Sequence, residues 1–400
     1  MALMSFEAAL AHILDGAGPL CEPPEAAPLN AALGRILARD VVAGRDQPPF
    51  ASSAMDGYAL GPAEAACWTV VGEASAGRAF RREVKAGEAV RIFTGAPVPR
   101  GCDRILIQEN SVRENERLRA DAVPPPGAHI RSAGLDFRAG ETLLHAGRKL
   151  TPRDLMLAAG ANLPALAVAA KPVIAILATG DELVAPGALP RDDQIVASGS
   201  TGVAAMVARS GGAPLDLGVA RDDPADLDKK IAAARGAHVL VTIGGASVGD
   251  YDLVEPALRR AGAIIDLHKI AMRPGKPLMA GRIGEMRVLG LPGNPVSAMI
   301  CAWAFLTPLL KRLLGDLTPD EPPAPAKLAA PLPQNGDRLH FMRAQTAPSP
   351  HGGAPRVRPL PDQDSSLMAA LARADRLIIR PPFAPALAEG DSVDAIPIDF

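Results

Sequence analysis

The sequence predicts an α/β multidomain protein: a doubly wound α/β domain with an inserted β-rich domain, a helical scaffold and a small C-terminal β domain. Three observations predict this class. The 400 residues exceed what one hydrophobic core usually supports, so about two to four domains are expected. From Lys171 onward, strand-like and helix-like segments alternate, which is typical of a mostly parallel sheet covered by helices. Before and after that region, short β-type runs are broken by glycine and proline.

The composition excludes several kinds of binding partner and indicates where the protein is located. The net charge is −2 and the chain has no long basic run, so neither nucleic acid nor an anionic membrane is expected as a partner. The four cysteines show no C-x-x-C spacing, which argues against a zinc site or a disulfide framework and indicates reduced thiols. The N-terminus lacks the features of a signal peptide, and no apolar run reaches the roughly 18 residues of a membrane span. We therefore expect a cytoplasmic protein.

Residues 1–45 and 141–170 are predicted to form one discontinuous scaffold domain. Ser5 is a candidate helix N-cap, because the apolar residues after it recur at helical spacing. A second helix is expected from about Asn30 to Arg39. In the returning segment Thr151 is an N-cap, followed by proline at the first helical position and an acidic residue at the third. All the boundary signals of this last helix agree.

Residues 46–140 are predicted to form the β-rich domain, inserted between the two halves of the scaffold. Three polar loops interrupt it: PPFASSAMDGYAL, FTGAPVPRGCD and GAHIRSAGLDFRAG. They contain Asp56, Thr94 and Asp136. Loops of this kind often carry function, because connection alone needs fewer residues. For Asp56, which precedes a glycine, spacing alone favours an ordinary hairpin turn.

Residues 171–320 are predicted to form the α/β domain. A proline-rich linker then leads into residues 321–400, the C-terminal β domain. The expected strands are PVIAILA, PLDLGV, HVLVTI, IIDLHKI and RVLGL, and the expected helices lie near Thr201–Arg209, Pro224–Arg235, Leu253–Ala261 and Pro295–Leu314.

Polar, glycine-rich loops follow these strands, at the edge where doubly wound folds bind ligands. The central loop follows HVLVTI and holds Gly244, Gly245, Ser247, Asp250 and Asp252. Glycines let the backbone come close to a ligand, and successive free N–H groups can hold an anion. An ordinary strand-to-helix turn explains the same glycines, so this loop alone favours a site only modestly.

Two neighbouring loops carry phosphate-binding features. Asn294 can cap the following helix and Pro295 suits its first position, which leaves free N–H groups at a positive helix end. Lys276 adds a positive charge. Glu182 and Asp222 would repel a phosphate unless a cation lay between them, and Mg²⁺ binds one or two carboxylates together with phosphate oxygens. The pattern therefore predicts a phosphorylated ligand with a divalent cation. The structural alternatives are a turn residue for Asp181, an N-cap for Asp223 and a tight strand-to-helix corner for LPGNP.

Seven motifs, in this order, resemble those of the molybdopterin molybdenumtransferase family, the bacterial MoeA type shared with the E domain of gephyrin. They are PPFASSAMDGYA, FTGAPVPRGCD, IRSAGLD, LATGDELVAPG, VTIGGASVGDYD, MRPGKP and LGLPGNPVSA. The resemblance runs from Pro48 to the segment PDQDSSLMAALARADRLIIRPP. It implies an elongated homodimer of four-domain chains with a shared active site. The implied reaction converts adenylylated molybdopterin and molybdate, with Mg²⁺, to molybdenum cofactor and AMP.

The resemblance also implies roles for individual residues. Catalytic roles fall on Asp56, Thr94, Asp136, Glu182 and Asp222, of which the first three would come from the partner subunit. Metal binding falls on Glu182, Asp222 and Asp252. Molybdate binding is implied for Arg273, Arg343, Ser365 and Ser366, since arginine and hydroxyl donors suit a dianion. The residues implied to bind the substrate are Gly244, Gly245, Ser247, Asp250, Asp252, Lys269, Lys276, Pro292, Gly293, Asn294 and Pro295.

The chain departs from the family pattern at several positions. Ala51 and Ser52 stand where the family has an acidic residue and an amide, Leu135 where it has Glu, Gly199 where it has Asn and Arg273 where it has Lys. These changes motivate an alternative, a non-catalytic pterin-binding or scaffold protein of the same family. The strand-end carboxylates alone would also allow an unrelated Mg²⁺-dependent nucleotidyl or phosphoryl transferase. An adenylyltransferase that supplies the pterin is a possible further partner.

Overall fold

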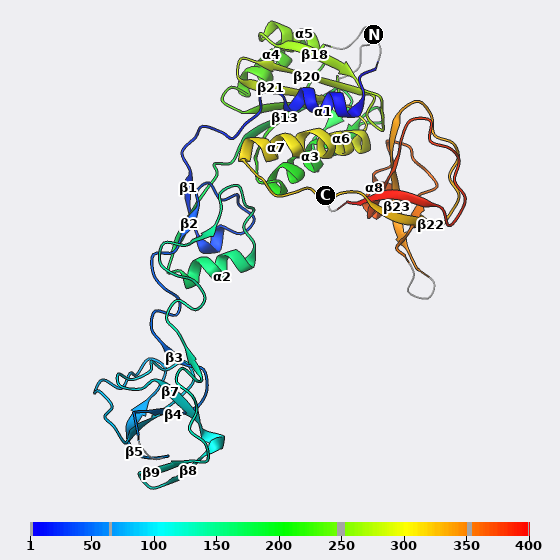
Figure 1. Cartoon of the computed structure of the whole chain (residues 1–400). Helices are drawn as coiled ribbons and strands as arrows, with labels where there is room; N and C mark the ends of the chain where they lie inside the picture. Colours follow the sequence, from blue (N-terminus) through cyan, green and yellow to red (C-terminus); the bar gives the residue numbers. More distant parts are fainter. Residues whose placement is uncertain (1–2, 64–65, 246–252, 350–353, 399) are drawn as a thin grey trace.

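The computed structural model describes residues 3–63, 66–245, 253–349, 354–398 and 400. The chain is elongated (Figure 1). The α/β domain lies at one end, the scaffold lies in the middle and the inserted β domain lies at the other end. The C-terminal domain sits beside the α/β domain, away from the inserted domain.

The α/β domain is built on one six-stranded sheet with the order β16-β13-β17-β21-β20-β18. The first four strands run parallel, and β20 runs antiparallel to both of its neighbours, β21 and β18. Parallel strands buried on both faces need apolar residues throughout, and β17 is buried at every position. The five expected strands are present, and the sequence missed β20, which pairs between two of them. The bounds are β13 (Val173–Thr179), β16 (Ala213–Ala220), β17 (Val239–Ile243), β18 (Ile264–Lys269), β20 (Pro277–Ile283) and β21 (Met286–Leu291).

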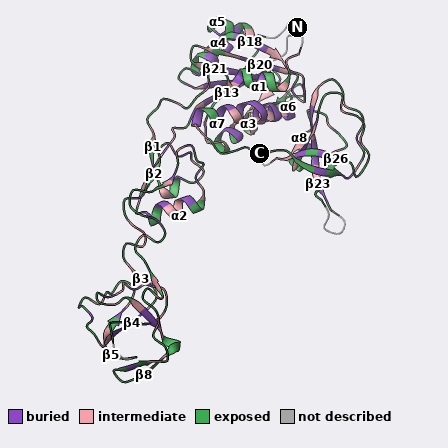
Figure 2. Ribbon diagram, in the orientation of Figure 1, coloured by how far each residue is buried: buried purple, intermediate pink, exposed green. Residues whose placement is uncertain are grey.

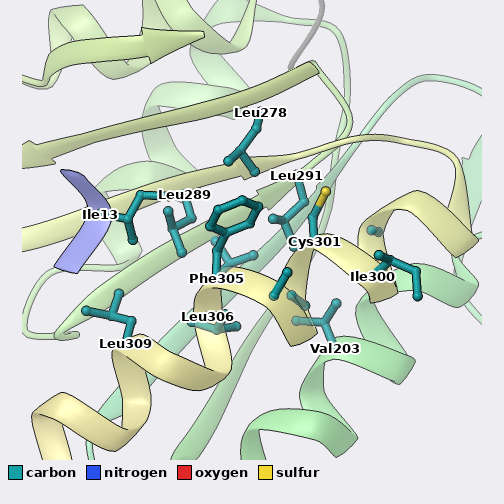
Figure 3. Packing of buried hydrophobic residues seen from close by; sticks show 14 of the residues in the cluster. Ile13, Val203, Leu278, Leu289, Leu291, Ile300, Cys301, Phe305, Leu306 and Leu309 are labelled. Carbon is teal, nitrogen blue, oxygen red and sulfur yellow. The ribbon is translucent and has the colours of Figure 1, made fainter. Parts of the chain in front are cut away.

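Helices cover both faces of this sheet. One face packs against α4 (Pro224–Ala233) and α5 (Val254–Arg260). The other packs against α3 (Ser198–Arg209) and the helical segment that begins at Pro295. Figure 3 shows Phe305 of that segment among Leu278, Leu289 and Leu291 from the sheet. In Figure 2 the central strands and the inner sides of these helices are mostly buried, while the outer sides are exposed.

The segment Pro295–Leu314 is one continuous helix in three parts. These are α6 (Pro295–Cys301), the π-helical stretch η3 (Ala302–Leu306) and α7 (Thr307–Leu314). By length and composition it is apolar enough to cross a membrane, but 67% of its most apolar stretch is buried inside the protein. Its apolar character is therefore explained by core packing.

The N-terminal helix does not lie in the scaffold, contrary to the prediction from the sequence. α1 (Phe6–Leu14) begins at the predicted N-cap, because the Ser5 side chain accepts from the Ala8 N–H at 3.2 Å. It then packs against α7 and η3 in the core of the α/β domain. Its apolar face was visible in the sequence, but which core it joins was not.

The scaffold consists of two small sheets and one helix. The sheets pair β1 (Glu25–Pro28) with β12 (Ala165–Val168) and β2 (Val41–Val42) with β11 (Thr142–Leu144). The helix α2 (Pro152–Gly160) carries the predicted capping box, since Thr151 and Asp154 satisfy each other's backbone N–H groups.

The prediction of a helix from Asn30 to Arg39 is wrong. Only η1 (Leu29–Ala31), a single 3-10 turn, forms there. Gly34 adopts a φ of +73° in a separate turn that follows, and Leu37 then bridges to Val168 as extended chain. Pairing with the returning half of the scaffold overrode the local helical spacing.

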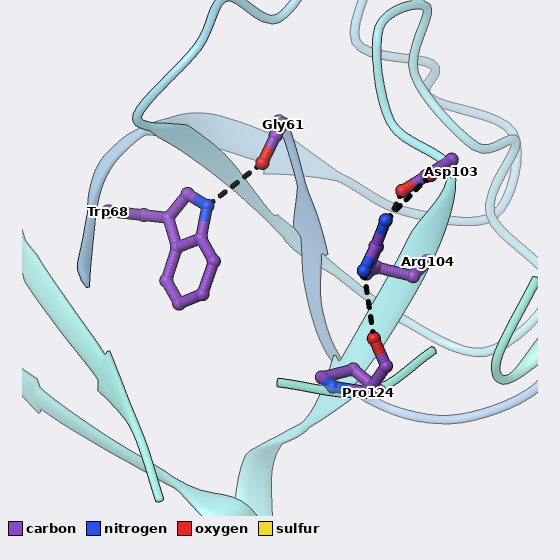
Figure 4. A network of polar contacts seen from close by, with 5 residues as sticks. All are labelled: Gly61, Trp68, Asp103, Arg104 and Pro124. Atoms are coloured by element: carbon purple, nitrogen blue, oxygen red, sulfur yellow. Dashed lines mark hydrogen bonds and ion pairs between the residues drawn. The ribbon is translucent and has the colours of Figure 1, made fainter. Parts of the chain in front are cut away.

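The inserted domain is β-rich, as predicted. Its sheet has the order β7-β4-β6-β5-β9-β8, and a short pair joins β3 to β10 at its boundary with the scaffold. Side-chain hydrogen bonds hold the connecting segments of this domain in place (Figure 4). Trp68 Nε1 donates to the Gly61 carbonyl at 2.9 Å, and the Arg104 guanidinium donates to the Asp103 carboxylate and to the Pro124 carbonyl. The bounds are β3 (Ser52–Ser53), β4 (Gly57–Leu60), β5 (Cys67–Ala74), β6 (Glu88–Ile92), β7 (Arg104–Ile107), η2 (Gln108–Asn110), β8 (Ser111–Glu114), β9 (Arg117–Ala120) and β10 (Ile130–Arg131).

The C-terminal domain is a small closed barrel. Its strands follow the order β23-β24-β22-β26-β25, and β25 pairs back onto β23. A two-residue strand of the α/β domain, β19, runs parallel to β23 and joins the two domains. The bounds are β19 (Met272–Arg273), β22 (Ala324–Leu328), β23 (Leu339–Ala347), β24 (Arg356–Pro359), α8 (Met368–Arg373), β25 (Arg376–Arg380) and β26 (Ser392–Pro397).

Candidate functional site

A cleft of about 810 Å³ opens at the carboxyl ends of β13, β17 and β21, the edge at which the sequence predicted a site. Its volume lies within the range of small-molecule sites. Among the predicted site residues, those that line the cleft are Glu182, Asp222, Gly244, Gly245, Pro292, Gly293, Asn294, Pro295 and Ser366.

Glycines form the floor of the cleft. Gly244 has a φ of +97°, and a Cβ there would stand 2.6 Å from the carbonyl oxygen of Thr179 on the neighbouring strand. Only glycine fits this position. Gly293 faces it across the floor, because a Cβ on Gly293 would meet the Gly244 Cα at 3.6 Å. A ligand can therefore approach the backbone of two adjacent strand ends.

Among the described residues, two carboxylates line the cleft. Glu182 follows β13 and Asp222 follows β16, and both are exposed. Their neighbours have structural roles, in line with the alternatives weighed from the sequence. The Asp181 Oδ1 accepts the Asp222 N–H at 3.1 Å, and the Asp223 side chain caps α4 by accepting the Asp226 N–H at 2.9 Å.

The start of α6 is covered by a loop of the C-terminal domain. Asn294 is the N-cap residue, but its side chain makes no capping bond, so that expectation is wrong. Its Nδ2 instead donates to Ser365 Oγ at 2.9 Å. The Val296 N–H donates to the Ser365 carbonyl at 3.1 Å, and this tertiary contact satisfies one of the open N–H groups of the helix. Ser366 and Met368 complete this wall of the cleft.

Arg343 lies behind that wall. Its side chain is buried, with 2% exposure, and its guanidinium donates to the carbonyl of Asp364 at 2.9 Å and to those of Asp362 and Leu367 at 3.4 Å. Ser366 donates to the Asp364 carboxylate through its hydroxyl at 2.6 Å and its N–H at 2.8 Å, which holds the pKa of Asp364 below its ordinary value. The structure thus places Arg343 under the loop that carries Ser365 and Ser366.

The other predicted cations lie outside the lining of the cleft. Lys269 and Lys276 flank the loop between β18 and β20, where the Ile270 N–H donates to the Lys276 carbonyl at 3.0 Å. Lys276 is exposed and directly precedes Pro277, which does line the cleft. Arg273 lies at the mouth of the C-terminal barrel, in a different cavity.

Asp56, Thr94 and Asp136 lie in the inserted domain, at the other end of the chain from the cleft (Figure 1). Asp56 Oδ1 accepts both the N–H and the hydroxyl of Thr94 at 2.8 Å, and these bonds lower the pKa of Asp56. Arg91, on the adjacent strand β6, stacks over the rings of Tyr58 and Phe93. Asp136 is exposed, and its N–H donates to the Gln47 carbonyl.

Sequence reasoning missed an apolar side of the cleft. Ile195 and Val196 form β15 (Ile195–Val196), a short parallel pair with β14 (Leu183–Val184). They line the cleft while remaining 60% and 41% exposed. Two adjacent β-branched residues within a polar, proline-rich loop were the available signal. Ser247, Asp250 and Asp252 lie outside the described residues.

Comparison with known proteins agrees with this architecture. Three family descriptions match in order: the MoeA N-terminal region over residues 4–161, a probable molybdopterin binding domain over 175–312 and the MoeA C-terminal region over 325–398. Together they cover most of the chain and separate its N-terminal, α/β and C-terminal parts.

The chain is similar to curated molybdopterin molybdenumtransferases. It is 31% identical to that of Haemophilus influenzae over 88% of each chain, and 32% identical to that of Synechococcus elongatus over 98% of this chain and 99% of the relative. A solved structure of the molybdopterin biosynthesis moeA protein from Pyrococcus horikoshii superimposes with a TM-score of 0.85 at 27% identity, covering 100% of both chains. The chain belongs to the molybdopterin molybdenumtransferase family.

Proposed function

We propose that this protein inserts molybdate into adenylylated molybdopterin, releasing AMP and forming molybdenum cofactor, in the cytoplasm. The observation that carries the proposal is the cleft itself. It joins a glycine floor, two carboxylates and the start of α6 at one sheet edge of a chain whose relatives are named molybdopterin molybdenumtransferases. Free Cys21 and Cys67, both exposed, are consistent with a reducing compartment.

The shape of the cleft suits a pterin that carries phosphate groups. The exposed Ile195 and Val196 offer an apolar surface to the flat ring system. The glycine floor at Gly244 and Gly293 admits the phosphate groups to within reach of backbone N–H groups. Lys276, one residue before the cleft wall, adds a positive charge for the same groups.

Glu182 and Asp222 fit a magnesium ion by their chemistry. They are exposed carboxylates facing one cleft, and Mg²⁺ favours one or two carboxylates with water and phosphate oxygens as its other ligands. Within the described residues no group of three or more acidic, histidine or cysteine side chains gathers into a metal site, so phosphate oxygens would have to share the coordination. When bound, the ion would neutralise charge between the phosphates and these carboxylates.

The proposal includes a homodimer with a shared active site. Asp56, Thr94 and Asp136 are separated from the cleft of their own chain by the scaffold (Figure 1), so they would act at the cleft of a second copy. The bonds from Thr94 hold Asp56 ionised and fixed in orientation. An adenylyltransferase that delivers the pterin would contact the open side of the cleft.

The test is AMP release from adenylylated molybdopterin, followed in the presence of Mg²⁺ and molybdate. Release that needs molybdate supports the proposal, and its absence with active substrate excludes it. Glu182→Gln should raise the Mg²⁺ concentration needed for half-maximal rate by about tenfold, because a charged ligand is lost. Glu114→Gln, an exposed substitution on the inserted domain, serves as the matched control and should leave the profile unchanged. An unaltered profile for Glu182→Gln would make Glu182 a turn residue.

A further inference from the structure

The C-terminal barrel has a cavity of its own, with a volume of about 690 Å³. It opens at the barrel mouth, where His340 of β23, Arg358 of β24 and Arg380 of β25 converge. Arg273 of β19 lies at its rim, in register with His340. Among the described residues, none that lines this cavity also lines the cleft of the α/β domain.

The cavity is strongly positive. Three arginines line it, and among the described residues no aspartate or glutamate does. Arg273 and Arg358 make no ion pair or side-chain hydrogen bond with any described residue. Arg356, two positions before Arg358 on the same strand, is in contrast neutralised by Glu389 at 2.6 Å. The positive charge at the mouth is therefore left without a counter-charge from the described chain.

His340 adds a buried polar group aimed into the same space. Its side chain is 6% exposed, and its ring nitrogens have no hydrogen-bond partner among the described residues. Burial, followed by the charges of Arg273, Arg338, Arg343 and Arg380, lowers the pKa of His340 to about 3. The ring is thus neutral at physiological pH and retains one N–H to donate. The ring nitrogens are open to the cavity, because among the described residues Thr242 Oγ1 is the one buried side-chain polar atom that lacks a hydrogen-bond partner. A ligand in the cavity can therefore accept from the imidazole N–H.

The walls of the cavity are fixed in place. Arg380 donates to the carbonyls of Pro333 and Ala384 at 3.3 Å and to that of Pro385. The Asn335 amide donates to three carbonyls of the adjoining loops, and the Gln363 amide donates to those of Arg343 and Leu360 at 2.9 Å. A site whose donors are already positioned loses little entropy on binding.

We propose that this cavity, defined by His340, Arg358 and Arg380, binds a small tetrahedral oxyanion. The Arg358 guanidinium, which makes no side-chain hydrogen bond with any described residue, matches the paired oxygens of such an anion. Arg380, held in the wall by its bonds to carbonyls, adds positive charge, and the neutral imidazole N–H of His340 supplies a further donor. The site goes beyond the proposed transfer reaction. Arg343, the buried arginine next along β23, turns its guanidinium to the loop at Asp362–Leu367 instead of this cavity.

The test is calorimetric titration of the full chain with inorganic phosphate and with sulfate, at low ionic strength where screening is weak. Both probes avoid molybdate, a substrate of the proposed reaction. Arg358→Ala should weaken binding by about tenfold or more, because one charge-assisted bond is lost. Arg358→Lys should retain part of the affinity. Arg119→Ala, which removes one exposed positive charge from the inserted domain, is the control and should stay within about twofold of the wild type.

A second measurement reports on the cavity directly. With isotope-labelled histidine, the ring signals of His340 should move on addition of phosphate, and those of His129 in the inserted domain should not. Equal binding of phosphate and glycerol phosphate assigns the site to a free oxyanion, and tighter binding of the ester assigns it to the phosphate group of a larger ligand. No binding of any probe, or equal affinity for the wild type and Arg358→Ala, overturns the proposal. AMP release, assayed separately, tests the proposed function without reference to these outcomes.

Discussion

Gly244→Ala should damage the fold and the cleft together. The residue has a φ of +97°, and an added Cβ would lie 2.6 Å from the Thr179 carbonyl oxygen and 2.9 Å from its hydroxyl. Thr179 is a buried residue of β13, whose backbone is held by strands on both sides, so neither atom can withdraw cheaply. The left-handed backbone costs an alanine about 1 to 2 kcal/mol, and the overlap adds about 1 to 3 kcal/mol.

Gly293→Ala is the matched control on the same floor. Its added Cβ would meet only the Gly244 Cα, at 3.6 Å, which is an ordinary contact, and its φ is not in the positive region. Its cost to folding should stay within about 0.5 kcal/mol. Both variants place a methyl group on the cleft floor, so both should lower turnover, whereas only Gly244→Ala should also lower stability.

Thermal denaturation followed by circular dichroism separates these effects. For a domain of this size, roughly 1 kcal/mol shifts the midpoint by about 2 to 4 °C. Gly244→Ala should therefore melt about 5 to 15 °C below the wild type, and Gly293→Ala within about 2 °C of it. If Gly244→Ala melted with the wild type, the close approach to Thr179 would be relieved by backbone movement, and the account of the glycine floor would be refuted.

Three further predictions concern other parts of the chain. Asp56→Asn should lower turnover by about tenfold or more while leaving pterin binding nearly intact, since Asp56 is proposed to act from the partner subunit; unchanged turnover would remove it from the site. Asp154→Asn should destabilise the scaffold by about 1 to 3 kcal/mol, because Asp154 closes the capping box of α2 and pairs with Arg148 at 2.9 Å. Burial acts to raise the pKa of Asp154, but its bonds with Arg148 and Thr151 outweigh burial and lower it. Its stabilisation should therefore be complete above the ordinary carboxyl pKa and fade only as the pH falls through the lowered value, so the melting points of the two proteins should converge in acid. Thiol titration of the native protein should label the exposed Cys21 and Cys67 quickly and the buried Cys301 only after unfolding. Cys102 should react slowly, because burial and then the charge of Asp103 raise its pKa to about 12. Rapid labelling of Cys301 would contradict its packing in the core.

The sequence was informative where a local rule determines the structure. The buried run Val239–Ile243 and the Thr151 capping signals each depend on a few neighbouring residues, and both appear as predicted. The row of polar strand ends also followed from local patterns, because parallel strands bring their carboxyl ends to one edge. Seven of the lining residues named in advance are glycines, prolines or carboxylates from that row: Glu182, Asp222, Gly244, Gly245, Pro292, Gly293 and Pro295.

What depended on distant partners could not be read in this way. β20 contains Gly281, whose absent side chain allows close pairing with β18, and its alternation is too weak to mark a strand. Asn294 was predicted to cap its helix, but its side-chain amide donates to Ser365, in a loop about seventy residues later. The family resemblance assigns Arg343 to molybdate, and nothing local in the sequence reveals that its buried guanidinium donates to backbone carbonyls. Such competition between local and tertiary partners is invisible in one sequence.

An aromatic cluster ties the two ends of the chain to the same helix. Phe6 lies 5.3 Å from Phe305 and 5.4 Å from Phe341 between ring centroids, and Trp303 stacks on Phe400 at 6.0 Å. During synthesis, the α/β core therefore exposes part of its surface until the last strands of the barrel have left the ribosome. A nascent chain stalled before Phe341 would present bare aromatic rings at α1 and η3, a surface that chaperones bind. Completion of the core is in this sense a late event, because Phe341 is made long after Phe6, which it contacts.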